Sequence, residues 1–260
     1  MAKFLEYVPG DSFLHRMNPC AKLIGAVLFA IACFVTSNLV FLLVLLAAAL
    51  AMAVSCGLGR ETAGLCKAVF AFSLILAVVI LLTTPHGTPL VPLPWGYVGT
   101  GSLLAALTVI VRLMAAAIPL FLVFYVTKMN DITNSAVKQL HVPYKYAFTF
   151  TSTVHFIPVF MNDMAGIMEA QTARGVEFDG SLVKKVRLMI PLCVPLLVSS
   201  VRKTNSAAIA AEVRGFNLRT RESGYKDYPL RAGDWGALAV CALVLAAAVV
   251  LAVLGTPTLG

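Results

Sequence analysis

Five long apolar stretches constrain this chain more than any other feature of its sequence. A helix needs about 20 mostly apolar residues to cross the hydrocarbon core of a bilayer. Apolar stretches that meet or approach this length occupy residues 21–35, 39–56, 68–84, 101–126 and 236–254. Apolar residues make up 60% of the chain and charged residues 12%, whereas soluble domains have about 45–50% and about 25%. The sequence therefore predicts an integral membrane protein and excludes an intrinsically disordered one.

The distribution of charge predicts how the chain is oriented in the membrane. Basic residues collect near the N-terminus and in segment 127–235, whereas connections 36–38 and 85–100 carry no formal charge. Cytoplasmic loops of membrane proteins are enriched in Lys and Arg. We therefore expect an odd number of spans and a cytoplasmic N-terminus. Two other apolar stretches, 146–160 and 188–201, are short or interrupted by proline and stay ambiguous as spans.

The segment between the fourth and the last span is too long and too structured in composition to be a linker. Loops of that length without internal structure are uncommon in compact proteins. The predicted fold is therefore an all-α polytopic membrane protein with about five spans. It comprises N-terminal transmembrane helices in 1–126, a helical cytoplasmic domain in 127–235 and a C-terminal transmembrane helix in 236–260.

Three helical patterns follow one another inside the cytoplasmic domain. The first covers 132–140, with Asn130 or Asp131 as its N-cap. Pro143 prevents its continuation, and a longer pattern then leads to Arg174. A third pattern begins at about Lys203, with apolar residues at helical spacing.

The second and third patterns end in the same way. One closes on Ala173, Arg174 and Gly175, and the other on Val213, Arg214 and Gly215. Gly is the usual residue just past a helix end, and Arg there complements the helix dipole, so one such ending indicates capping only. Because two such endings occur in matching contexts, a capping role and a docking role for the two Arg residues are equally open. A docking Arg would make a bidentate contact with a carboxylate or with carbonyls of a partner protein.

Arg112 and a methionine stripe are further candidates for contacts. Arg112 lies near the middle of the fourth apolar stretch, where a charge costs roughly 2.5–3.5 kcal/mol unless it faces protein or water. It either ties two helices together, through carbonyls or hydroxyls such as that of Thr108, or faces a partner in the membrane. Met161, Met164 and Met168 either pack within the protein or form an adaptable apolar platform for a partner.

Several chemistries are excluded by what the sequence lacks. A phosphate-binding loop requires a Gly-Lys pair, and the chain contains none. The histidines have no ligand spacing with Cys or Asp, so we expect no metal site and no cofactor. The net charge of +8 comes without a run of five or more like charges, which argues against nucleic acid as a partner. No catalytic residue is predicted.

An ordered set of short motifs covers nearly the whole chain. In sequence order, the motifs are Asp11-Ser-Phe-Leu-His-Arg-Met-Asn-Pro19 followed by Lys22-Leu23, then Arg112 with Tyr125-Val-Thr127 and Asp131, then Leu140-His-Val-Pro143, then His155-Phe-Ile-Pro158, and finally the two Arg-Gly endings. This set resembles the transmembrane T component of energy-coupling factor (ECF) transporters, the family that includes the cobalt-transport permease. Two positions depart from the family pattern. His155 stands where Arg is usual, and Val213 where Ala is common.

The resemblance implies a non-catalytic coupling subunit in a prokaryotic cell membrane. Two cytoplasmic ATPases would hydrolyse ATP, and a separate S component would capture a vitamin or a transition metal. Arg174 and Arg214 would lie on helices that dock into the two ATPases, while Arg112 and the methionine stripe would contact the S component. The alternatives are a stand-alone secondary carrier, which should show inverted repeats, and a membrane-embedded enzyme, which needs a convergent cluster of acids, bases or metal ligands.

Overall fold

The chain forms two compact units. The computed structural model describes residues 10, 12–83, 89–93, 96–176, 182–220, 223 and 226–254, so Asp11 of the first motif lies outside the described residues. Unit 1 comprises Met1–Ser135 with Tyr228–Gly260, and unit 2 comprises Ala136–Asp227. The boundaries expected at 126 and 235 separate membrane-spanning segments from a cytoplasmic domain, whereas units 1 and 2 are defined by compactness. The expected boundaries therefore stay predictions.

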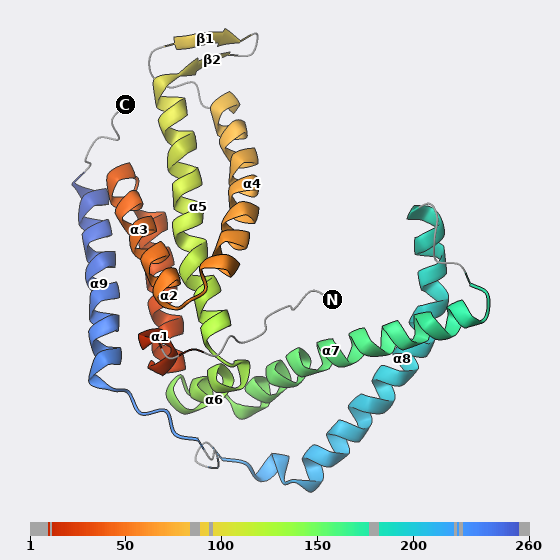
Figure 1. Ribbon diagram of the computed structural model, residues 1–260. Coiled ribbons are helices and arrows are strands. Elements are labelled where there is room, and N and C mark those ends of the chain that lie inside the picture. The colour runs from red at the N-terminus through yellow and green to blue at the C-terminus, as the bar shows by residue number, and fades with distance from the viewer. Residues whose placement is uncertain are drawn as a thin grey trace. The chain divides into compact units, whose positions relative to one another are not determined.

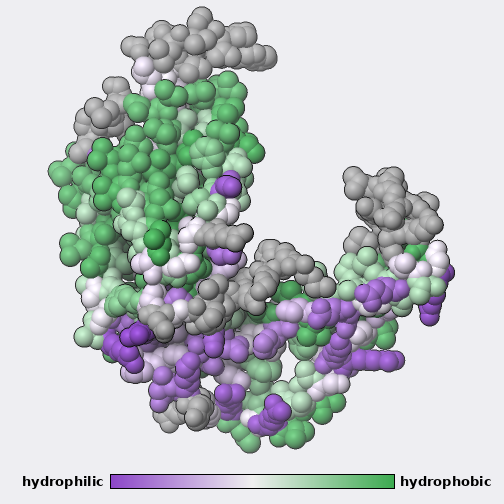
Figure 2. All heavy atoms as spheres, in the orientation of Figure 1, coloured by the Kyte–Doolittle hydropathy of each residue, from purple (hydrophilic) through white to green (hydrophobic). Residues whose placement is uncertain are grey.

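Unit 1 is a bundle of apolar helices (Figure 1). Its helices are α1 (Phe13–Arg16), α2 (Pro19–Val35), α3 (Leu39–Ser55), α4 (Gly59–Thr83), α5 (Thr100–Val126) and α9 (Ala232–Val253). Within the described residues, α4, α5 and α9 are long and apolar enough to cross a membrane, and α2 and α3 are shorter apolar helices. The five predicted apolar helices are therefore confirmed, as is the all-α polytopic class. Apolar surface dominates the outside of these helices (Figure 2).

Side-chain caps define where α2 and α3 begin. Asn18 Oδ1 accepts a hydrogen bond from the Cys20 amide at 3.0 Å, and Pro19 occupies the first helical position. Asn38 Oδ1 accepts from the Val40 amide at 3.0 Å. Asn satisfies amides that have no partner inside a helix, and Pro at the first position sacrifices no hydrogen bond. Residues 36–38 therefore form the expected connection between the first two apolar helices.

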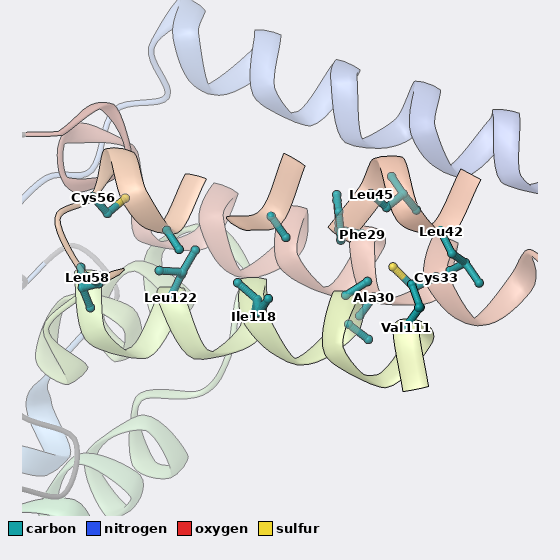
Figure 3. Packing of buried hydrophobic residues seen from close by; sticks show 14 of the residues in the cluster. Phe29, Ala30, Cys33, Leu42, Leu45, Cys56, Leu58, Val111, Ile118 and Leu122 are labelled. Carbon is teal, nitrogen blue, oxygen red and sulfur yellow. The ribbon is translucent and has the colours of Figure 1, made fainter. Parts of the chain in front are cut away.

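Helix α5 is the centre of unit 1, because it packs against α2, α3 and α4. Cys33 of α2, Leu42 of α3, and Ile118 and Leu122 of α5 are almost completely buried. Figure 3 shows their side chains lying between the three helices. Small residues such as Ala115 let the helix backbones approach closely, which is typical of helix packing in membranes.

A two-stranded hairpin precedes α5 in the Pro-rich segment. Strands β1 (Pro89–Leu93) and β2 (Gly96–Gly99) pair antiparallel, with Leu93 opposite Gly96 and a register irregularity between Pro89 and Val91. The sequence analysis treated 85–100 only as an uncharged connection, and the proline content of this segment gives no strand signal. An isolated pair of strands tolerates Pro, since edge positions need not donate every hydrogen bond.

A polar cluster connects the helices at one end of the bundle. It consists of the buried residues Asn18, Lys22 and Asp234 and the partly buried residues Asp131 and Tyr228. Asp234 accepts from the Asn18 amide at 3.1 Å and from the Arg231 amide at 2.8 Å. Asn18 Nδ2 donates to the Tyr228 carbonyl at 2.9 Å, and the Tyr228 hydroxyl donates to Asp131 Oδ1 at 2.8 Å. Lys22 Nζ donates to Thr127 Oγ1 at 3.2 Å. Burial, reinforced by the Asp131 carboxylate, raises the pKa of Tyr228, so its hydroxyl remains a donor.

Helix α6 (Met129–Gln139) runs across the boundary between the two units. The prediction that Asn130 or Asp131 caps it was wrong, because the helix begins at Met129. The amides of Asp131 and Ile132 both donate to the Lys128 carbonyl, at 2.9 and 3.1 Å. Asp131 instead lies in the first turn, where its charge suits the helix dipole.

Unit 2 is built on two long helices, α7 (Tyr144–Ala173) and α8 (Leu182–Val213), followed by the short helix η1 (Phe216–Leu218). The predicted start of the third helix at Lys203 was wrong, since α8 continues through Pro191 and Pro195. Both prolines lie on an exposed face four residues apart, where a bend and a lost hydrogen bond are tolerated. The ambiguous stretches 146–160 and 188–201 lie in these helices, and neither helix is among the candidate spans in the described part of the chain.

Removing the Asp234 carboxylate should destabilise the bundle. We expect Asp234→Ala to lower the free energy of unfolding by about 2 kcal/mol, since one buried and one partly buried amide lose a charged acceptor. Thermal unfolding of the purified chain in detergent measures this. Asp227→Ala is the matched control, because the Asp227 side chain is exposed in its pair with Lys138 and such pairs contribute little. Equal losses in the two variants would contradict the role given to Asp234.

Candidate functional site

The first Arg-Gly turn closes α7 with a left-handed glycine. Gly175 has φ +86°, a conformation that side chains with a Cβ rarely adopt. The Gly175 amide donates to the Thr172 carbonyl at 2.9 Å, and the Val176 amide donates to the Gln171 carbonyl at 3.1 Å. These two bonds are the Schellman pattern of a helix end. The pattern leaves Ala173 and Arg174 exposed at the tip of the helix.

The second turn closes α8 with the same glycine geometry and different neighbours. Gly215 has φ +74°, and its amide donates to the Glu212 carbonyl at 2.9 Å. Helix η1 then begins directly after Gly215. Val213 is 83% exposed and Leu218 is 84% exposed. Arg214 is therefore flanked by apolar side chains that unit 2 itself does not cover.

An aromatic cluster braces the second turn against the start of α7. The Phe216 ring lies 5.5 Å from the Tyr144 ring and 4.8 Å from the Phe148 ring, measured between centroids. The Arg219 guanidinium lies 4.5 Å over the Tyr144 ring, and its Nη1 donates to the Tyr144 hydroxyl at 2.7 Å. Aromatic pairs and cation–π contacts each contribute about 0.5–1.5 kcal/mol, and both aromatic pairs here are tilted. The residues after Gly215 are thus held in place.

Both docking candidates present a charged group to solvent. Arg174 and Arg214 are exposed, and neither guanidinium has a hydrogen-bond or ion-pair partner within the part of unit 2 that the structure describes. Capping of each helix end is achieved by backbone amides and glycine. Capping therefore does not require the Arg side chains, which are left available for a partner carboxylate.

Arg112 ties α5 to the end of α2. Its Nη2 donates to the Thr36 carbonyl at 2.8 Å, and Thr36 is the C-cap residue of α2. A cation at a helix C-terminus satisfies a free carbonyl and complements the dipole. Thr108, which the sequence suggested as a partner, donates to the Leu104 carbonyl instead. This contact supports the interpretation of Arg112 as a tie between helices.

The methionine stripe is only partly available to a partner. Met161 is 64% exposed, whereas Met164 and Met168 are half-buried on α7. Met161 thus remains the most accessible member of the predicted platform.

Sequence reasoning missed the polar contact that joins α7 to α8. Lys203 Nζ lies 2.6 Å from both carboxylate oxygens of Asp163, and Ser199 Oγ donates to Asp163 Oδ2 at 3.0 Å. A signal was present in the sequence, because Asp163 and Lys203 occupy matching positions before the two Arg-Gly endings. Among the described residues there is no group of three or more metal-ligating side chains.

Comparison with known proteins shows one family. Residues 10–225 match the family described as cobalt transport protein (CbiQ). The chain is 31% identical to the energy-coupling factor transporter transmembrane protein EcfT of Brevibacillus brevis, over 81% of this chain and 83% of the relative. It is 32% identical to the protein of that name from Heliobacterium modesticaldum, over 83% and 85%, and 29% identical to that of Bacillus subtilis, over 93% and 94%.

Loss of the Arg112 tie should weaken the bundle. We expect Arg112→Gln to lower the free energy of unfolding by about 1–3 kcal/mol, because the Thr36 carbonyl loses its charged donor. The unfolding temperature in detergent tests this. Arg202→Gln, on an exposed face of α8, serves as the control and should leave that temperature unchanged. An Arg112→Gln variant as stable as the control would count against the tie.

Proposed function

Since this chain belongs to the cobalt transport protein family and is a transmembrane T component of energy-coupling factor transporters, we propose that it couples ATP hydrolysis by partner proteins to substrate uptake. Two cytoplasmic ATPases would supply the energy. A membrane-embedded S component would bind the substrate, a vitamin or a transition metal. The chain itself would transmit force and catalyse no reaction.

The observation that carries this proposal is the pair of equivalent tips in unit 2. Each long helix ends on an exposed Arg followed by a left-handed Gly. A planar guanidinium held on a rigid helix end recognises a carboxylate with two parallel hydrogen bonds. Two such tips suit two partner proteins, or two copies of one partner. We propose that Ala173, Arg174 and Gly175 dock into one ATPase, and that Val213, Arg214 and Gly215 dock into the other.

The second tip adds an apolar contact to the charge. Ile209, Val213 and Leu218 are 63%, 83% and 84% exposed around Arg214. Exposed aliphatic side chains of this kind are covered at protein interfaces, where they contribute affinity by leaving water. Val213, which departs from the family pattern, would then enlarge the apolar contact.

The remaining candidate residues divide between structural and binding roles. Met161 is exposed on α7 and supports an adaptable contact with the S component. Arg112 is engaged with Thr36, which favours a role inside the bundle over such a contact. We propose that the apolar helices of unit 1 lie in a prokaryotic cell membrane, with the N-terminus cytoplasmic as the distribution of basic residues suggests.

A stand-alone secondary carrier is the alternative function. Carriers place ionisable residues at the midplane of several spans, whereas in the five apolar stretches of this chain only Arg112 lies near the middle of one. Reconstitution of the purified chain in liposomes separates the two functions. Substrate uptake driven by an ion gradient, without ATPases, would favour the carrier and overturn the coupling role.

Charge reversal at the tips should release the ATPases. We expect Arg174→Glu and Arg214→Glu each to weaken binding by about 2–5 kcal/mol, because a partner carboxylate would face a like charge. Co-purification of the ATPases with the tagged chain measures the loss. Arg202→Glu reverses an exposed charge elsewhere on α8 and should retain both ATPases. A double Arg174→Glu/Arg214→Glu variant that retained both ATPases and normal uptake would exclude docking through these residues.

The apolar flank of the second tip should contribute separately. We expect Leu218→Ser to weaken ATPase binding about tenfold, since burying one Leu side chain contributes about 1.5–3 kcal/mol. A titration of the ATPases against the chain in nanodiscs gives the affinity. Leu230→Ser changes a half-exposed Leu in unit 1 and should bind as the unaltered chain does. Equal affinities for the Leu218 and Leu230 variants would rule out the apolar contact.

A further inference from the structure

The two long helices of unit 2 share a second correspondence besides their endings. Asp163 precedes Arg174 by 11 residues, and Lys203 precedes Arg214 by the same 11 residues (174 − 163 and 214 − 203). Asp163 and Lys203 carry opposite charges. The structure brings these two matching positions into direct contact.

The contact is an ion pair in which Lys203 contacts both carboxylate oxygens of Asp163, and Ser199 adds a hydrogen bond to the same carboxylate. Lys203 Nζ lies 2.6 Å from Asp163 Oδ1 and 2.6 Å from Asp163 Oδ2, and Ser199 donates to Oδ2 at 3.0 Å. The side chains are 39% and 21% exposed for Lys203 and Asp163. Ser199 and Lys203 are one helical turn apart, so two successive turns of α8 contact the Asp163 carboxylate.

The direction of the two helices puts the Arg tips on opposite sides of this contact. Helix α8 runs back along α7, because Asp163 meets Lys203 in the middle while Tyr144, at the start of α7, meets Phe216 just past the end of α8 (Figure 1). Eleven residues of helix span about 16 Å. Each Arg is therefore the same distance from the ion pair along its own helix.

We propose that the Asp163–Lys203 pair, assisted by Ser199, is the positioning contact that fixes where α7 and α8 cross, and so sets the separation of Arg174 and Arg214. This inference rests on the proposed docking role of the two Arg residues. A slip of one residue along either helix would move that tip by about 1.5 Å and rotate it by about 100°. The register of the crossing thus decides whether both tips fit their partners at once.

We expect the pair to fix where α7 and α8 cross rather than to add to the free energy of unfolding. Ion pairs that are partly open to solvent contribute little to the free energy of folding. The Lys203 hydrogen bond lowers the pKa of Asp163 below its ordinary value, so the carboxylate keeps its charge at the pH values where an ordinary Asp side chain does. The tie is consequently constant across the physiological pH range and does not act as a pH switch.

The test is a distance measurement across unit 2 in the full chain. Ala170 and Ala210 are exposed, and each lies four residues before its Arg. Nitroxide labels on p-acetylphenylalanine at these positions avoid the six native cysteines, and electron–electron resonance in nanodiscs gives the distance distribution. We expect one narrow distribution for the unaltered pair, and a broadened or shifted one for Asp163→Asn and for Lys203→Met.

Charge exchange makes the test specific for the pair. Asp163→Lys combined with Lys203→Glu should restore a narrow distribution, whereas Lys145→Met, at an exposed Lys elsewhere on α7, should never lose it. In the assembled transporter, the single variants should retain the ATPases and lose uptake per ATP hydrolysed, and the exchanged variant should recover it. Unchanged distributions in both single variants, or no recovery on exchange, would overturn the proposal.

The outcome is separable from that of the docking proposal. If the Arg174 and Arg214 variants keep their ATPases, docking fails whatever the distances show. If those variants lose the ATPases while Asp163→Asn leaves the distance distribution unchanged, docking stands and the positioning role of the pair fails.

Discussion

The need to satisfy backbone hydrogen bonds without water governs the architecture of unit 1. A chain in hydrocarbon meets this need most simply as a helix, and only the helix ends then require other partners. Helices α2 and α3 are only 17 residues long, about 25 Å at the usual rise. A larger share of their backbone groups therefore lies at helix ends and needs other hydrogen-bond partners. Asn18 and Asn38 satisfy amides at two of these ends, and Arg112 satisfies a carbonyl at a third. The short lengths of the apolar helices α2 and α3 thus explain why polar side chains lie at their ends.

Features encoded in short windows of sequence were predictable. The five apolar helices, the connection at 36–38 and the two Arg-Gly endings each depend on a few neighbouring residues, and all are present in the structure. The start of α8 was not predictable in this way, because Pro191 and Pro195 normally signal an interruption. Their common exposed face, known only from the structure, explains why the helix continues. The hairpin β1–β2 escaped prediction for the same reason, since its prolines disfavour strands.

Contacts between distant residues were beyond the reach of pattern reasoning. Tyr228 meets Asp131 across 97 positions of sequence, and Asp163 meets Lys203 across 40. Nothing local selects these partners over other polar residues nearby. For Arg112 the sequence left two roles open, and only the position of the Thr36 carbonyl separates them. Asp163 and Lys203 lie at the same spacing from Arg174 and Arg214. A comparison of the sequences of α7 and α8 therefore indicates this contact, whereas neither helix sequence does so alone.

The hydrogen bond between Tyr228 and Asp131 has a consequence for the ancestry of the fold. Asp131 lies just before the chain leaves unit 1, and Tyr228 is the first residue on its return. The two departure points are thus neighbours, which is the arrangement that tolerates insertion of one domain into another. A change in the length of unit 2 would therefore leave the chain path through the apolar bundle the same.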